Sequence, residues 1–179
     1  MRAPIADNPS SNPRQANSPL NKAPLHQLII DRLQANLAQA ERAALTAYET
    51  ATHEENIAEN KYDTLGLEAS YLAAGQARRV EEIRQSLSAW QQLTLRPFDA
   101  QRGIQLTALV WLSDAQGAEQ CLFLGPDGAG LKVQWDAQEV LVISPRAPLG
   151  QRLIGCAEGD EVAVQVGGST QTFAVLRVC

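Results

Sequence analysis

Four carboxylates lie within one short stretch of the chain, over residues 54–63: Glu54, Glu55, Glu59 and Asp63. Glu55, Glu59 and Asp63 are spaced by four residues, so in a helix they would share one face, and like charges at that spacing repel. Such a cluster binds Mg²⁺ when a second site completes the coordination with water and phosphate oxygens. The alternative is a solvent-exposed helix end, in which Asp63 caps the following helix.

Heptad patterns on both sides of this cluster predict the helices that position it, because apolar positions alternate between spacings of three and four residues. The first seam comprises Ile30, Leu33, Leu37, Ala40, Ala44, Ala47 and Ala51. The second seam comprises Gly66, Ala69, Ala73, Gln76, Val80, Ile83, Leu87 and Trp90. They predict an antiparallel helical hairpin over residues 25–97, about 45 Å long, with its acidic tip at residues 53–64. Small seam residues near the tip predict a slim distal half.

The remainder of the chain, residues 98–179, is predicted to form a small β domain. Pro97 ends the helical pattern. Short β-branched or aromatic runs follow, separated by turn signals, over residues 104–112, 120–125, 131–135, 139–144, 161–166 and 171–178. A short helix is expected near residues 148–154, and the glycine-rich residues 125–130 lie between strands and are expected to form a turn. The predicted fold class is α+β.

The first 24 residues are rich in Pro, Asn and Ser, and we expect them to form a disordered leader. The net charge of −5 argues against a protein that grips nucleic acid through phosphate contacts, and a protein partner fits better. Neither a secretory signal nor a membrane span is visible in the sequence.

Single residues give weaker signals. The three cysteines lack metal-ligand spacing, and we expect reduced thiols of a cytoplasmic protein, two of them in the core and one at the terminus. His26 and His53 are expected to be solvent-exposed, and Trp111 and Trp135 are expected in the core.

Several motifs resemble the Gre transcript-cleavage factors of bacteria. Glu59-Asn60 followed by Tyr62 resembles the Glu-Asn…Tyr that follows the acidic tip of that family. Residues 148–155 (PLGQRLIG) and 158–162 (EGDEV) resemble its C-terminal signature Ser-Pro-Leu-Gly-x-Ala-Leu-Leu-Gly…Gly-Asp-x-Val. The resemblance covers roughly residues 28–178, and the C-terminal stretch is its more specific part.

The resemblance implies an FKBP-like C-terminal domain that docks at the rim of the RNA polymerase secondary channel while the coiled coil enters the channel. Tip carboxylates, here from Glu59, Glu55, Glu54 and Asp63, would then assist hydrolysis of backtracked RNA. Glu55 and Glu59 would share the polymerase Mg²⁺ only in the complex, and the chain alone would bind no cofactor and be no enzyme. We expect a cytoplasmic monomer that contacts nucleic acid only through the elongation complex and does not bind membranes.

The tip departs from the family pattern in one respect. The family run Gly-Asp-Leu-x-Glu-Asn corresponds to residues 55–60, where Asn56 replaces the Asp and Glu59 is kept. Glu55 or Glu54 could substitute, but each is displaced by one or two residues, a rotation of about 100° each. Three hypotheses stay open: a cleavage factor, a non-catalytic regulator that uses the same channel, and an interaction module that no longer binds polymerase.

Overall fold

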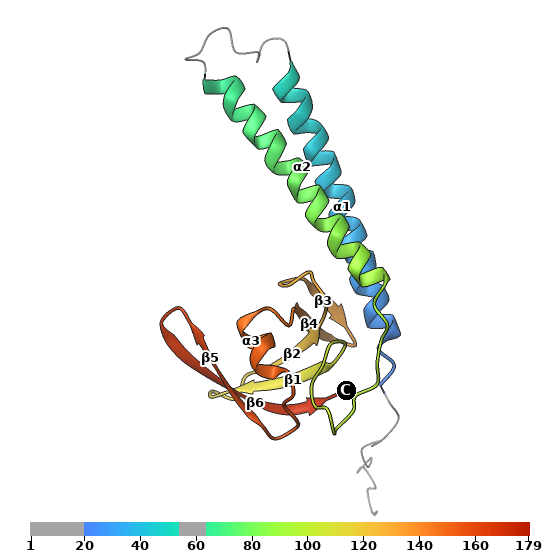
Figure 1. The fold of residues 1–179 in the computed structure, drawn as a ribbon, viewed down its shortest axis with the longest axis vertical. Coiled ribbons are helices and arrows are strands. Elements are labelled where there is room, and N and C mark those ends of the chain that lie inside the picture. Colours follow the sequence, from blue (N-terminus) through green and yellow to red (C-terminus); the bar gives the residue numbers. More distant parts are fainter. Residues whose placement is uncertain (1–19, 54–63) are drawn as a thin grey trace, which may run out of the picture.

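The computed structural model describes residues 20–53 and 64–179, and Figure 1 shows two long antiparallel helices rising from a β domain. Helix α1 spans Ala23–Thr52, and α2 spans Thr64–Gln91. The sheet contains β1 (Leu109–Asp114), β2 (Glu119–Leu124), β3 (Lys132–Trp135), β4 (Gln138–Ile143), β5 (Glu161–Val166) and β6 (Ser169–Val178). A short helix, α3 (Pro148–Leu153), precedes β5. This arrangement confirms the predicted class, a helical hairpin followed by a small FKBP-like β domain with one short helix.

The two heptad seams hold the hairpin together. Every residue of both seams is buried or half-buried, and the helix faces between them are exposed. Ala40, Val80 and Ile83 form a separate small core in the middle of the hairpin. Toward the tip, Ala47 faces inward from α1 and Gly66 from α2. Side chains this small let two helices approach closely, so the distal hairpin has a thin core.

Helix α2 ends earlier than the sequence predicts. It stops at Gln91, six residues before Pro97, and an extended linker follows. Leu93 and Leu95 pack from this linker against the core beneath the hairpin. The backbone N–H of Arg96 donates to Thr107 Oγ1 at 3.0 Å. Burial of two leucines in an extended conformation thus replaces the last predicted turn of the helix.

The six strands form one mixed sheet in the order β3-β4-β2-β1-β6-β5. All neighbours are antiparallel except β2 and β4, which are parallel. The run predicted as a strand from residue 104 begins only at Leu109. Thr107 adopts a left-handed backbone (φ 76°), and its N–H bonds to Leu124 O instead of joining a ladder.

Each face of the sheet carries its own core. Leu109, Phe123 and Val142 pack against the base of the hairpin, including Leu25 and Ile29 of α1. On the opposite face, an apolar cluster joins β1, β2, β5 and β6 to Leu153 of α3. The hairpin is therefore seated on one sheet face, and α3 covers the other.

Some single-residue predictions need correction. Trp111 and Trp135, expected in the core, are only partly buried, whereas Trp90 is fully buried. Of the two cysteines expected in the core, Cys121 is buried but Cys156 is half-exposed beside Arg152 O at the end of α3. Within the described residues, no helix is long and apolar enough to cross a membrane.

Candidate functional site

The predicted tip carboxylates, Glu54, Glu55, Glu59 and Asp63, lie outside the described residues, as does Asn56. The described chain reaches His53 on α1 and resumes at Thr64 on α2. In the part of the chain that is described, no three His, Cys, Asp or Glu side chains are grouped so that they could hold a metal ion. Metal binding at the tip stays a prediction, and the structure defines the stem and joint that carry the tip.

Charged pairs mark the middle of the stem. Arg84 Nη2 contacts Glu41 Oε1 across the hairpin at 2.6 Å. On α2, the carboxylate of Glu82 lies 3.3 Å from Arg78 Nε and 3.5 Å from Arg79 Nη1. All these side chains are exposed, so each pair contributes about 0–1 kcal/mol at most. Only the Arg84–Glu41 pair links α1 to α2, whereas the two pairs of Glu82 lie within α2.

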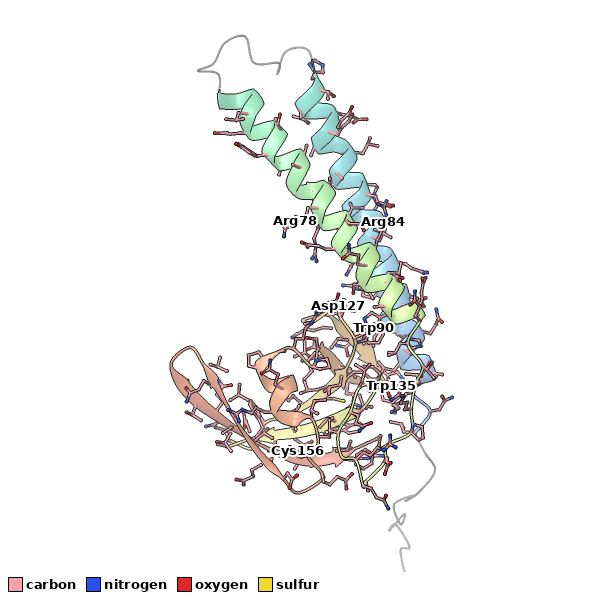
Figure 2. The ribbon with its side chains drawn as sticks, in the orientation of Figure 1. Arg78, Arg84, Trp90, Asp127, Trp135 and Cys156 are labelled. Atoms are coloured by element: carbon pink, nitrogen blue, oxygen red, sulfur yellow. The ribbon has the colours of Figure 1, made fainter. Side chains whose placement is uncertain are left out.

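Trp90 joins the stem to the β domain. Its indole N–H donates to the backbone carbonyl of Asp127 at 3.0 Å, and its ring lies 5.6 Å from that of Phe123. Figure 2 shows Trp90 and the Asp127 loop meeting where the hairpin reaches the sheet. Gly125 leaves room for the Trp90 ring, because a Cβ atom at position 125 would lie 2.2 Å from that ring. The end of α2 therefore packs on the glycine-rich turn that the sequence predicts over residues 125–130.

His26 reinforces this joint from α1. Its Nε2 lies 2.9 Å from the backbone oxygen of Trp90, and the two rings lie 5.8 Å apart. His26 is half-buried, so the expectation that it is solvent-exposed was wrong, while His53 is exposed as expected. The side chain of His26 is held by a residue 64 positions away, and no local pattern signals such a contact.

Lys22 ties together three segments of the chain. Its buried ammonium donates to Thr107 O at 2.6 Å, Arg96 O at 2.8 Å and Cys179 O at 3.2 Å. These three acceptors match the three donors of an ammonium group. Burial lowers the pKa of Lys22 below its ordinary value.

The position of Lys22 corrects the predicted leader. Residues 20–24 are ordered, Leu20 packs against the core, and residues 1–19 lie outside the described residues. A lysine in a stretch rich in Pro, Asn and Ser gave no sign of burial, and only its long-range contacts reveal it.

The C-terminal signature shapes the turn into β5. Gly150 is required, because a Cβ atom would lie 2.1 Å from Ser144 O. Asp160 Oδ2 accepts from Ala157 N, and Glu158 Oε1 accepts from Val178 N, both at 2.8 Å. Ala147 caps α3 without a side-chain bond. These residues hold α3 and β6 in place, so the signature describes a local fold.

Comparison with known proteins addresses the C-terminal domain directly. A family model described as "Transcription elongation factor, GreA/GreB, C-term" matches residues 105–179. Residues 105–179 are therefore similar to the C-terminal domain of GreA/GreB factors. The chain is also 31% identical over 102 residues to "Transcription elongation factor GreA" of Halorhodospira halophila (strain DSM 244 / SL1). That match covers 56% of the chain and 60% of the relative, so the chain spans less than two thirds of the relative's length.

Solved structures that resemble this chain include that of GreA factor homolog 1 (Gfh1) of Thermus thermophilus, with 22% identity and a TM-score of 0.35. This match covers 84% of the chain and 94% of the Gfh1 chain. A GreA/GreB factor of Nitrosomonas europaea is 19% identical with a TM-score of 0.34, over 63% of this chain and 91% of that one.

Proposed function

We propose that the protein is a transcription elongation factor that binds RNA polymerase in the cytoplasm and inserts its hairpin into the secondary channel. The observation that carries the proposal is the attachment of a long hairpin to a GreA/GreB C-terminal domain through the buried Trp90 joint. The C-terminal domain would dock on the polymerase surface, and the hairpin would carry the tip residues inward.

The shape of the stem supports insertion. Helix α1 has 30 residues, which at the standard rise gives a reach of about 45 Å. Small seam residues such as Ala47 keep the distal helices close together. Trp90, His26 and Lys22 anchor the base through contacts with Asp127, the end of α2 and the C-terminal strand. A thin stem on a firmly held base suits entry into a narrow channel as a monomer.

At the tip, Glu59 with Glu55 or Glu54 would lend carboxylates to the second Mg²⁺ of the polymerase, with Asp63 close by in sequence. In a two-metal scheme, that ion stabilises the attacking and leaving oxygens during hydrolysis of backtracked RNA. The polymerase supplies the active site, so the protein contributes ligands and is not an enzyme by itself.

Asn56 favours a second candidate function. It occupies the position of one family carboxylate and carries no charge, which makes it a weaker Mg²⁺ ligand. In this alternative, the protein occupies the same channel and modulates or inhibits the polymerase without promoting cleavage.

A backtracked elongation complex with end-labelled RNA separates the two functions. The wild-type protein is compared with Glu59→Ala at the tip and with Glu68→Ala, an exposed stem glutamate that serves as the matched control. Shortening of the RNA that requires Mg²⁺, disappears with Glu59→Ala and persists with Glu68→Ala supports cleavage. Polymerase binding without RNA shortening supports the non-catalytic regulator. Absence of polymerase binding contradicts both functions.

A further inference from the structure

Strand β3 is an edge of the sheet, and helix α1 runs beside it. Among the described residues, β3 pairs with β4 alone, and α1 contacts β3. A groove with a volume of about 460 Å³ lies between the two elements. Its lining comprises Leu28, Asp31, Arg32 and Ala35 from α1 and residues 132–134 from β3. The side of β3 that has no neighbouring strand is therefore bordered by a helix.

The turn between β3 and β4 determines which backbone groups of β3 are paired. It consists of Asp136 and Ala137, whose φ angles are 50° and 62°, and Trp135 faces Gln138 across it. In a two-residue turn with positive φ at both positions, the closing residues form a hydrogen-bonded pair. Because bonded and non-bonded pairs alternate along an antiparallel ladder, the next bonded residue of β3 is Val133.

Lys132 and Gln134 consequently direct their backbone N–H and C=O groups away from β4. The bond from Val142 N to Leu131 O, which is 2.8 Å long, fits the same alternation at the other end of the strand. The free edge therefore presents two donors and two acceptors, one pair about 7 Å from the next. A row of groups at this spacing pairs with the backbone of another extended chain.

The lysine of β3 does not block this edge. Lysine side chains often protect edge strands from pairing with other chains. The ammonium of Lys132, however, contacts Glu139 Oε1 of β4 at 2.8 Å, so this side chain lies back over its own sheet. The backbone of β3 stays accessible from the groove.

The helix side of the groove supplies apolar contacts and one available charge. Leu28 and Ala35 are seven residues apart on α1, about 10 Å at the helical rise, which matches the length of a four-residue strand. Asp31 between them accepts from Gln27 Nε2 at 2.8 Å. Arg32 is exposed and forms no ion pair within residues 20–53 and 64–179. Its guanidinium is therefore available to a carboxylate of a ligand.

We infer that β3 and α1 form a docking groove for an extended peptide segment of a partner protein, which joins the six-stranded sheet as a further strand and places an acidic side chain against Arg32. Backbone hydrogen bonds to Lys132 and Gln134 supply affinity in this mode, and alternate side chains supply specificity. A partner helix does not fit the edge, because its own N–H and C=O groups are paired within the helix. The inference goes beyond the proposed function and does not depend on it.

A displayed library of random octapeptides, selected on the full chain, supplies the probe for the test. The peptide recovered most often is synthesised, and calorimetry measures its affinity for the wild type, Gln134→Pro and Arg32→Gln. Proline at position 134 removes the outward N–H and leaves the paired groups of the β3–β4 ladder in place.

Each variant has a matched control. Gln165→Pro places a proline in β5, the strand at the opposite edge of the sheet. Arg42→Gln removes an exposed arginine from the same helix as Arg32 but outside the groove. Circular dichroism checks that every variant is folded, and hydrogen exchange of the wild type reports on the backbone N–H groups of Lys132 and Gln134 directly.

We expect Gln134→Pro to weaken peptide binding by about tenfold or more, as for a lost hydrogen bond that leaves its partner unpaired. Arg32→Gln should weaken binding about two- to fivefold, as for an exposed ion pair, and added salt should reduce this difference. Both controls should bind the peptide like the wild type. Bound peptide should slow hydrogen exchange at Lys132 and Gln134.

Three results overturn the inference. The first is a library that yields no binding peptide. The second is a peptide that binds Gln134→Pro or Arg32→Gln as tightly as the wild type, or that leaves exchange at Lys132 and Gln134 unchanged. The third is a wild type that recovers no peptide, self-associates, and becomes monomeric with Gln134→Pro, which assigns the edge to a second copy of the chain.

Discussion

The indole N–H of Trp90 donates to the carbonyl of Asp127 across 3.0 Å, and this bond joins the last turn of α2 to the loop between β2 and β3. The two residues are 37 positions apart in the chain. Around the bond, Phe123 from the sheet and His26 from α1 pack on the same indole ring. One fully buried side chain therefore contacts both helices' base and the sheet at the point where the hairpin meets the β domain.

Gly125→Ala should weaken this joint. The added methyl group would lie 2.2 Å from the buried Trp90 ring, so the ring or the loop must shift. We expect the free energy of unfolding to fall by about 1–3 kcal/mol, as for other overpacked cores. Urea unfolding followed by tryptophan fluorescence measures this change. Gly75→Ala is the control: that site is open space in mid-helix, so the same methyl group should stabilise by about 0.5–1 kcal/mol. Equal effects of both substitutions on the free energy of unfolding would contradict the close packing of Gly125 against Trp90.

Lys22→Met should destabilise the base of the hairpin. The methionine keeps the aliphatic stem but removes three hydrogen bonds, leaving the main-chain oxygens of Arg96, Thr107 and Cys179 without this donor. We expect a loss of about 1–3 kcal/mol in the free energy of unfolding. Hydrogen exchange should also rise in the linker that follows α2. An unfolding curve identical to that of the wild type would show that the buried ammonium does not contribute to the free energy of unfolding.

Ser86→Ala should leave the fold unchanged or stabilise it. Ser86 is 6% exposed, and its hydroxyl has no hydrogen-bond partner among residues 20–53 and 64–179. Removing a buried unpaired hydroxyl relieves its desolvation cost, so we expect a gain of up to about 1 kcal/mol. Ser88→Ala, at an exposed position where the hydroxyl accepts from Gln92, should change stability by less than about 0.5 kcal/mol. A clear loss of stability with Ser86→Ala would mean that a bound water pairs this hydroxyl.

Cys121 should resist alkylation in the folded protein. Burial raises the pKa of its thiol to about 12, so almost no reactive thiolate forms at neutral pH. Iodoacetamide labelling followed by mass spectrometry should modify the half-exposed Cys156 and Cys179 first. Cys121 should react only after urea is added. Labelling of Cys121 at the rate of Cys179 without denaturant would contradict its burial.

The same thiol predicts a pH dependence of stability. Above the ordinary thiol pKa of 9.0, the unfolded chain releases the Cys121 proton while the folded chain keeps it until about pH 12. The unfolded state therefore binds fewer protons in this window, and the free energy of unfolding falls as the pH rises. Cys121→Val removes that contribution, so its stability should decline less steeply than that of the wild type between these pH values.

Periodic features of the fold were predictable from the sequence because they repeat locally. The seam through Ala40 and Ala47 on α1, and through Val80 and Ile83 on α2, follows from heptad spacing alone and is buried as predicted. Pro148 and Gly155 likewise mark a short helix close to its observed bounds. The end of α2 was placed too late, because the burial of linker leucines is not a local signal.

The joint was not predictable in the same way. Lys22 meets Cys179 across 157 positions and His26 meets Trp90 across 64, and no spacing rule links such residues. For the tip, the sequence predicts a chemistry that the structure does not test, because Glu55 and Glu59 lie outside the described residues. The structure therefore defines how the tip is carried, and its chemistry rests on the proposed function.

Photo-crosslinking from the distal stem tests the central claim most directly. A benzophenone side chain is placed at position 71, where Tyr71 is exposed, and the full chain is mixed with RNA polymerase. Mass spectrometry then locates the crosslinks on the polymerase. Insertion of the hairpin predicts crosslinks to residues that line the secondary channel. Crosslinks confined to the outer surface of the polymerase, or none at all, would contradict it.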